Sequence, residues 1–346
     1  MRHGTGVAIM ERLFSGNLSK GSGLAFGFIL LIAFVFASMV YGATPISWSD
    51  VYYSFTQYDG TSNAHIIVQT SRVPRAFTAA AIGACLAVAG SLIQGLTRNP
   101  LADPSVLGIN FGASFMIVFS VTVLSITSLP ALTALSFAGA TVAAVAVYLL
   151  GSLGRDGLTP LKIILAGAAL SALFSSFTQG MLVLNEQSLS EVIFWLTGSV
   201  AGRSFDMLKA VLPLMVVGWI ASFWITRHMN VLTMGEDTAQ GLGQRTLFVK
   251  LAAGLIIVAL AGSSVAVAGP VGFIGLIVPT IARLFSGNDY RWIIPYSAVL
   301  GAIIVLVADI AARFVIRPEE LPVGVMTAII GIPAFIAIAR KGIVNK

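Results

Sequence analysis

Charged residues are scarce in this sequence. Asp, Glu, Lys and Arg make up 10% of the 346 residues, whereas about 25% is usual in soluble domains. Hydrophobic residues make up 57%. So few charges cannot cover a soluble globule of this size, which argues against a cytosolic enzyme or a nucleic-acid-binding protein. Because a membrane-spanning helix needs roughly 20 mostly apolar residues, the composition predicts an all-α polytopic membrane protein with about ten spans.

Several chemical signatures are also missing. The one cysteine, Cys85, lies in an apolar stretch and is best explained as a small packing residue. His3, His65 and His228 are scattered and lack the spacing of a metal site. No Gly-Lys dipeptide occurs, so the chain has no phosphate-binding loop. These absences argue against an enzyme, and a pump of this kind would need a partner that hydrolyses ATP.

Ionisable residues within the apolar stretches would mark an ion relay. Asp309 is the only acid deep in the second half of the chain, and Arg313 follows it by one helical turn. Side chains four residues apart on a helix lie on the same face, so this spacing predicts an ion pair. The lack of other such acids argues against a proton- or sodium-coupled transporter.

The uncharged stretches of the chain predict ten spans with short connections. We expect a cytoplasmic segment at 1–23, one transmembrane domain at 24–341 with a cytoplasmic loop at 227–250, and a cytoplasmic tail at 342–346. The first stretch has an apolar part too long for a signal peptide and is expected to be retained. The predicted spans lie in Leu24–Val40, Ala76–Thr97, Pro104–Gly154 (two, separated near Ser125–Pro130), Ile163–Asn185, Ala210–Thr226, Leu251–Ala282 (two, separated at Gly269–Gly272), Trp292–Ala308 and Leu321–Ala339.

The basic residues predict the orientation. With the N-terminus inside, alternation of the loops places fourteen of the 20 Lys and Arg residues in the cytoplasm and six outside. This asymmetry agrees with the positive-inside rule and puts both termini in the cytoplasm. The net charge of +6 therefore needs no acidic ligand.

The cytoplasmic loop contains a candidate short helix at Gly235–Gly243. Glu236 and Asp237 suit a helix N-terminus, and Gly241 and Gly243 suit a helix end. Two interpretations stay open on these residues alone, a docking site for an ATPase and an ordinary surface helix. A second pattern, Ala87–Gly90 repeated as Ala266–Gly269, is either a trace of an inverted repeat or a chance match in a chain rich in small residues.

A series of short motifs supplies a more specific indication. They are Arg72-Val73-Pro74-Arg75, Gln94-x-x-x-Arg98-Asn99-Pro100-Leu101-Ala102-Asp103-Pro104, Trp195-Leu196-x-Gly198-Ser199, Gly235-Glu236-x-x-Ala239-x-x-Leu242-Gly243, Gly272-Phe273-Ile274-Gly275-Leu276-Ile277-Val278-Pro279, Ala308-Asp309-x-x-Ala312-Arg313 and Glu320-Leu321-Pro322-Val323-Gly324. In this order they resemble the FecCD-type permeases, which are membrane subunits of ABC importers for iron–siderophore complexes, haem and vitamin B12.

The resemblance implies a bundle like that of the vitamin B12 importer permease, in a bacterial cytoplasmic membrane. It implies two cytoplasmic ATPase subunits, a second permease chain, and an extracytoplasmic binding protein that delivers a metal chelate. We expect an iron(III)–siderophore as cargo, with haem or cobalamin as alternatives, and a heterodimer of permeases in preference to a homodimer. A secondary transporter is the less favoured class, and no nucleic acid, resident metal or cofactor is expected.

The resemblance also assigns residues. Arg72, Arg75 and Arg313 are expected to dock the binding protein, and Gly235, Glu236, Ala239, Leu242 and Gly243 to couple to the ATPase. A set of motif residues is expected to serve the structure or the pathway, namely Gln94, Asn99, Pro100, Trp195, Gly198, Gly272, Gly275, Pro279, Asp309, Pro322 and Gly324. Cargo is expected to pass along Ile163–Val183 and Ser188–Ser199. Many relatives carry His after Pro279, whereas this chain has Thr280, so no histidine can act there.

Overall fold

The structure is a computed structural model that describes residues 16–42, 44–153, 159–184, 192, 195–316 and 319–344. Over these residues all regular secondary structure is helical. In a hydrocarbon layer only a helix or a closed barrel pairs every backbone group, which is why the uncharged stretches form helices. The elements are α2 (Asn17–Val40), α3 (Trp48–Thr56), α4 (Asn63–Ile67), η1 (Val68–Arg72), α5 (Val73–Thr97), η2 (Pro104–Leu107), α6 (Ile109–Thr122), α7 (Leu129–Ser152), α8 (Pro160–Leu184), α10 (Phe205–Thr233), α11 (Glu236–Gly241), α12 (Thr246–Ile257), η3 (Val258–Gly262), α13 (Ser263–Ala268), α14 (Ile274–Ser286), α15 (Tyr290–Val315) and α16 (Val323–Val344).

Among the described residues, 7 helical segments are long and apolar enough to cross a membrane. They are α2, α4–η1–α5, α7, α8, α10, α12–η3–α13 and α15. Three shorter apolar helices, α6, α14 and α16, occupy the remaining expected segments. The chain is therefore a multi-pass helical membrane protein, whereas the count of ten crossings and the location of the termini stay predictions.

Both expected breaks between neighbouring spans are confirmed. α6 ends at Thr122 and α7 begins at Leu129. α13 ends at Ala268 and α14 begins at Ile274, with the glycine- and proline-containing segment 269–272 between them. Gly269 has φ +74°, which a right-handed helix cannot contain, and Pro270 has no backbone N–H to donate, so α13 stops there.

Two helices are longer than the sequence indicated. α2 begins at Asn17, before the expected start, and the ammonium group of Lys20 donates a hydrogen bond of 2.7 Å to the carbonyl of Ser286. α10 continues past Arg227 to Thr233, so the cytoplasmic loop contains less irregular chain than expected. Residues 1–15 of the expected N-terminal segment and residues 345–346 of the expected tail lie outside the described residues.

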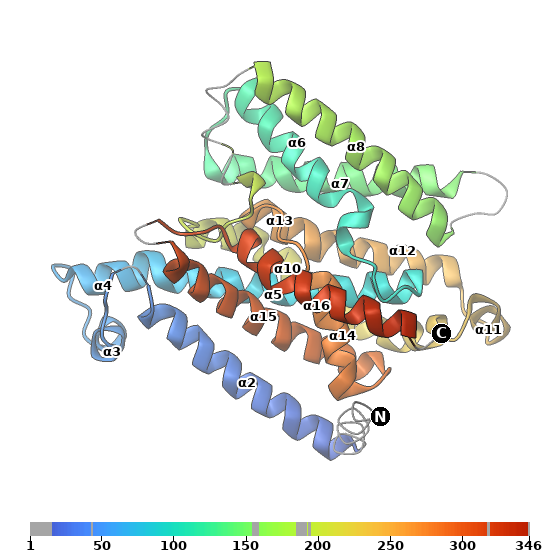
Figure 1. Cartoon of the computed structure of the whole chain (residues 1–346), viewed down its shortest axis with the longest axis horizontal. Coiled ribbons are helices and arrows are strands. Elements are labelled where there is room, and N and C mark those ends of the chain that lie inside the picture. The colour runs from blue at the N-terminus through green and yellow to red at the C-terminus, as the bar shows by residue number, and fades with distance from the viewer. Residues whose placement is uncertain are drawn as a thin grey trace.

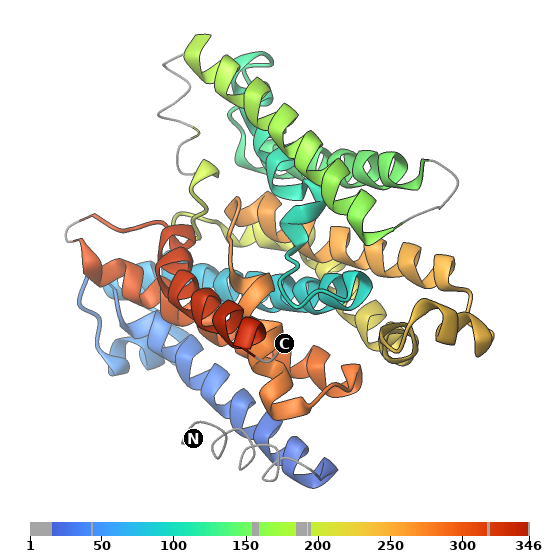
Figure 2. The same ribbon diagram turned by 45° about the vertical axis from the view of Figure 1, so that its right-hand side comes forward.

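The helices form layers with α5 in the middle. In Figures 1 and 2, α6, α7 and α8 lie together on one side, α2 lies on the opposite side, and α5 runs between α10, α12–α13, α14 and α15. In the most apolar stretch of the α4–η1–α5 segment, 83% of the residues are buried inside the fold. The corresponding share is 17% for α2 and 11% for α8. α5 is therefore the core of the fold, and α2 and α8 are its periphery.

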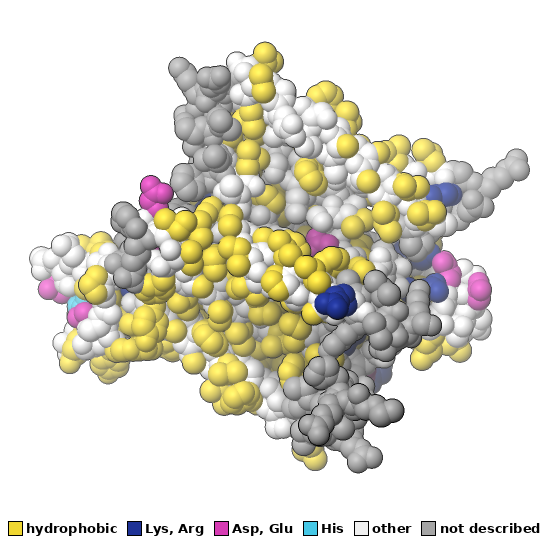
Figure 3. All heavy atoms as spheres, in the orientation of Figure 1, with side chains coloured by type: hydrophobic (Ala, Val, Ile, Leu, Met, Phe, Trp, Pro, Cys, Tyr) yellow, Lys and Arg dark blue, Asp and Glu magenta, His cyan; other side chains and the backbone are white. Residues whose placement is uncertain are grey.

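The distribution of hydrophobic and charged side chains on the surface fits a location in a lipid bilayer. Figure 3 shows hydrophobic side chains over the middle of the face formed by α2, α15 and α16, whereas most charged side chains visible there lie toward the two ends. One end carries α3 and α4, and the other carries α11 and the first turns of α2. We refer to them as the α3 end and the α11 end.

Small residues bring the central helices into backbone contact. A Cβ atom on Gly83 of α5 would lie 2.2 Å from the carbonyl oxygen of Gly301 on α15. One on Gly90 would lie 2.0 Å from the carbonyl oxygen of Gly275 on α14. Close approach of this kind gives van der Waals contact that lipid chains cannot match, which is how helices associate in membranes.

We predict that Gly83→Leu lowers the stability of the chain by about 1–3 kcal/mol or more, because a side chain must push α5 and α15 apart. The control is Gly254→Ala on α12, where a Cβ atom meets nothing within 4 Å. Thermal unfolding of the purified variants in detergent measures both. Equal midpoints for Gly83→Leu and the unmodified chain would contradict this packing.

Candidate docking and coupling sites

Arg75 is the centre of an ionic cluster at the α3 end. Its guanidinium group donates to both carboxylate oxygens of Asp309, with the shortest distance 2.7 Å from Nη2 to Oδ1. Its Nη1 atom donates to Glu320 Oε2 at 2.6 Å. Arg75 lies at the start of α5, Asp309 near the end of α15, and Glu320 just before α16. One side chain therefore joins three segments that are distant in sequence.

Arg72 and Arg313 complete this cluster by capping the end of α2. Arg313 Nη1 donates to the carbonyls of Ser38 and Tyr41 at 2.7 and 2.6 Å. Arg72 donates to the carbonyls of Met39, Val40 and Thr44. The last carbonyls of a helix have no partner within it, and cations near this end are favourable because of the helix dipole. These two arginines supply both the hydrogen bonds and the charge.

The expected pair between Asp309 and Arg313 is confirmed. All three arginines are buried, with exposed fractions of 5% for Arg72, 9% for Arg75 and 2% for Arg313. Each guanidinium group binds groups within the chain, and a direct contact with a binding protein stays a prediction. The sequence analysis missed Glu320 as the second acid of the cluster and the α2 carbonyls as partners, because nothing in the local sequence places them beside the arginines.

Backbone hydrogen bonds join three segments that carry motif residues: the one around Gly198, the end of α13 and the start of α16. We call this contact the junction. The amide of Ser199 donates to the carbonyl of Ala268, and the amide of Gly324 donates to the carbonyl of Gly198. A Cβ atom on Gly324 would lie 2.3 Å from the carbonyl oxygen of Thr197. Trp195 is buried here, and the guanidinium group of Arg203 lies 3.9 Å from its ring centroid. The motif glycines thus hold the break between α13 and α14 against the start of α16, just after Pro322.

A second group of motif residues lies between α5 and α14. Gln94 Nε2 donates to the carbonyl of Leu276 at 2.9 Å, and Gln94 Oε1 accepts from Arg283 at 2.7 Å. Gly275 packs against α5, and Pro279 is buried within α14. Asn99 and Pro100 form the turn after α5, where Asn99 Oδ1 accepts from the amide of Leu101. An added Cβ at Gly272 would meet no atom within 4 Å, so no close packing explains that motif glycine.

The helix expected in the 227–250 loop is confirmed. It is α11, which lies at the end of the bundle opposite α3 and α4 (Figure 1). Gly235 has φ +132° and Gly243 has φ +79°. Backbone of this kind is strained for other residues, so the two glycines fix the turns on either side. Ala239 is buried beneath the helix, whereas Leu242 is 67% exposed.

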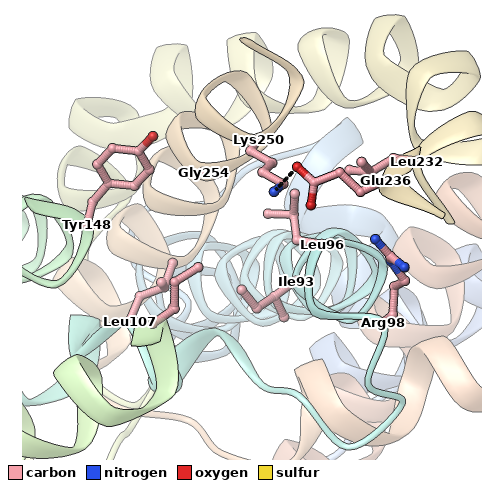
Figure 4. A pocket seen from close by; sticks show the side chains of 10 residues that line it. Ile93, Leu96, Arg98, Leu107, Tyr148, Leu232, Glu236, Lys250 and Gly254 are labelled. Atoms are coloured by element: carbon pink, nitrogen blue, oxygen red, sulfur yellow. Dashed lines mark hydrogen bonds and ion pairs between the residues drawn. The ribbon is translucent and has the colours of Figure 1, made fainter. Parts of the chain in front are cut away.

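Glu236 fastens α11 to α12. Lys250 Nζ donates to Glu236 Oε1 at 2.6 Å, and Thr246 Oγ1 donates to the same oxygen at 3.3 Å. The hydrogen bond from Lys250 holds the pKa of Glu236 below its usual value, with a smaller contribution from Arg98. Figure 4 shows Glu236 and Lys250 pointing toward each other beside Arg98, at the edge of a cavity of about 70 Å³. A movement of α11 would therefore reach α12 directly.

Exposed apolar side chains adjoin α11, and the sequence analysis did not single them out. Met234 is 70% exposed, Leu247 is 60% exposed and Phe248 is 70% exposed. They flank Leu242 along the chain: Met234 follows α10, and Leu247 and Phe248 lie in the first turn of α12 at the α11 end. Exposed apolar patches outside a membrane often mark protein interfaces.

The expected cargo pathway includes α8, which is largely uncovered in the single chain. Its exposed residues include Ala168, Ala172, Ser176 and Gly180, each four residues after the one before. Residues with this spacing share one helix face, and small residues permit a second helix to approach closely. Of the expected Ser188–Ser199 segment, the structure describes only residue 192 and residues 195–199.

Residues 30–341 match the FecCD transport family. The chain belongs to this family. The chain is 55% identical over 315 residues to the probable siderophore transport system permease protein YfiZ of Bacillus subtilis, covering 91% of this chain and 94% of that protein. It is 42% identical to the iron(3+)-hydroxamate import system permease protein FhuB of the same organism, covering 91% and 82%. It is 38% identical to the ferric enterobactin transport system permease protein FepD of Escherichia coli, covering 90% and 93%.

The fold is also similar to a solved structure. A metal-chelate type ABC transporter in an inward-facing conformation superposes with a TM-score of 0.81 at 26% identity, covering 93% of this chain and 99% of that one. The chain therefore has the FecCD permease fold, and its family consists of transport proteins, which agrees with the sequence analysis.

We predict that Asp309→Asn destabilises this permease by about 3–5 kcal/mol, because it leaves two buried guanidinium groups without their shared carboxylate. The matched control is Asp206→Asn. Asp206 and its partner Lys209 have side chains 82% and 64% exposed, and breaking such a pair costs about 0–1 kcal/mol. Thermal unfolding in detergent tests both, and a similar small change in the two variants would contradict a structural role for the cluster.

Proposed function

We propose that this chain is the permease subunit of an ABC importer that carries an iron(III)–siderophore complex across a bacterial cytoplasmic membrane. The observation that carries the proposal is the match to siderophore permeases over nearly the whole chain, together with α11 at one end of the bundle. Haem or cobalamin is the alternative cargo on the same architecture. A secondary transporter is less favoured, since Asp309 is fully used in pairing two arginines.

The proposed arrangement has ten spans with both termini and α11 in the cytoplasm. A dimer of ATPase subunits docks at α11, where Leu242 and the neighbouring exposed apolar side chains offer a contact surface. Gly235 and Gly243 hold the shape of this segment, Ala239 anchors it, and Glu236 joins it to α12. ATP-driven movement of α11 then reaches α12 and, through η3 and α13, the junction with α16.

A second permease chain packs against α8, and cargo crosses between the two chains. The small residues of α8 support this placement, because they allow close helix contact and leave room along the interface. We favour a heterodimer over a homodimer, as in many siderophore systems.

The binding protein docks at the α3 end. Arg72, Arg75 and Arg313 set the shape of this surface by fixing the ends of α2, α5 and α15. Arg75 also reaches the edge of the cluster beside Glu320, whose side chain is 27% exposed. A carboxylate of the binding protein at this edge would gain a charge-assisted contact.

The experiment that tests this function is uptake into proteoliposomes that contain the full permease complex, with ATP inside and binding protein outside. We expect uptake of a radiolabelled iron(III)–hydroxamate to require ATP and to persist with a protonophore. Glu236→Lys places two cations together where α11 meets α12, so it should lower uptake and cargo-stimulated ATP hydrolysis at least severalfold. Asp237→Asn is the control, because Asp237 is exposed beside Glu236 on the same helix.

The outcomes separate the alternatives. Uptake that a protonophore abolishes without need of the ATPase would show a secondary transporter. Preference for haem or cobalamin over the iron(III) complex would overturn the cargo assignment alone. Full ATP hydrolysis and uptake in Glu236→Lys would overturn the coupling role of α11.

A further inference from the structure

An apolar groove runs along the bundle between α2 and α10. It has a volume of about 490 Å³, and α5 and α15 form its floor. The floor is lined by small side chains such as Ala80, Ala84 and Ala298, and the walls include Phe28 of α2 and Phe223 of α10. Because the glycine contact already draws α5 and α15 together, the alanines leave a trough that no larger side chain fills.

The groove is too small for another helix. A spanning helix is about 10 Å wide and about 30 Å long, which far exceeds this volume. Phe28 and Phe223 are 49% and 50% exposed, so the groove opens to the surroundings of the bundle rather than to its core. An occupant that lies within the groove is therefore slender and apolar, and in the hydrocarbon layer the bilayer supplies acyl chains of this shape.

One basic side chain marks the α11 end of the groove. Arg291 lies on α15 three residues before the groove residue Ile294, so the two share a helix face. Arg291 is exposed and forms no salt bridge with another described residue. Arg227, four residues after Phe223 on α10, lines a separate cavity beside α11 and α12 together with Arg245.

The nearest acid on these elements is already engaged. Asp289 caps α15 by accepting from the amide of Arg291 at 3.0 Å, and it also accepts from Asn230 Nδ2 at 2.7 Å. Both hydrogen bonds end on Oδ1, and Asp289 also interacts electrostatically with Arg291. No salt bridge joins the two side chains, so the donors of the Arg291 guanidinium group remain available to an anion at the membrane surface. Basic residues near the membrane surface attract anionic lipid headgroups.

We propose that the groove is a binding site for an anionic phospholipid, with an acyl chain lying along Ala84 and Ala298 and the phosphate group held by Arg291. The lipid bridges α2 and α10, which the groove otherwise separates. This site is independent of the identity of the transported cargo.

Trp219 lines the groove and provides a probe. The full-length permease is reconstituted in phosphatidylethanolamine vesicles that contain a minor fraction of phosphatidylglycerol, with bromine on the acyl chains of one lipid or the other. The Trp219 signal is the difference between the unmodified chain and Trp219→Phe. We expect brominated phosphatidylglycerol to quench this signal with about fivefold higher apparent affinity than brominated phosphatidylethanolamine, the preference expected from one basic residue near the surface.

Two variants and one control decide the outcome. Arg291→Gln should abolish the preference for phosphatidylglycerol, whereas Arg245→Gln, which removes an exposed charge at the same end but away from the groove, should retain it. Ala298→Phe should fill the groove and lower quenching by both lipids. Equal quenching by the two lipids in the unmodified chain, an unchanged preference in Arg291→Gln, or a Trp219 signal that no lipid quenches because a protein covers it would each overturn the proposal.

Discussion

The close contact of α5 with α14 and α15 is the constraint on which the rest of the structure depends. Helices in a bilayer gain little from burying apolar surface, since lipid is equally apolar, so they associate through packing and polar contacts. Gly83, Gly90, Gly275 and Gly301 supply that packing. Substituting one of them changes the distance between helices whose ends carry the candidate sites.

α5 also connects the two ends of the molecule. Its start carries Arg75 in the ionic cluster, and its last turns carry Gln94, which binds α14 and Arg283. The α3 end is fixed by buried ion pairs, whereas α11 at the other end is a short helix held by Glu236 and two glycine turns. This difference suits a transporter in which one end receives a closed binding protein and the other end moves with an ATPase. Asp309 is the member on which the ionic cluster depends most, because removing its charge leaves the buried guanidinium group of Arg313 without an acidic partner.

Much of the fold follows from local sequence. Uncharged stretches predict where the apolar helices lie, and the glycine–proline segment after Ala268 predicts the break before α14. The α11 helix and the Asp309–Arg313 pair also follow from spacing over a few residues. The burial of Arg72 against carbonyls of α2, the contact of Arg75 with Glu320, and the groove between α2 and α10 depend on segments far apart in the chain. No local pattern specifies them, because they arise only when α5 brings those segments together.

The short motifs indicated the family, which composition and residue spacing alone did not. They also assigned roles to individual residues, but the surroundings of those residues came only from the structure. The three arginines are an example. Their positions at one end of the bundle follow from the order of the spans, but their partners come from α2, α15 and the segment before α16. The arginines at this end therefore form a buried, preformed cluster rather than three separate exposed charges.

The orientation of the bundle tests the central claim most directly, because the α3 end must face the binding protein and α11 must face the ATPase. Native Cys85 is buried, so single cysteines can be introduced at Thr61 and Asp237, both exposed and at opposite ends. A membrane-impermeant maleimide applied to intact spheroplasts should label Thr61→Cys at once and Asp237→Cys only after the membrane is opened. Labelling of Asp237→Cys from outside, with Thr61→Cys protected, would contradict the account.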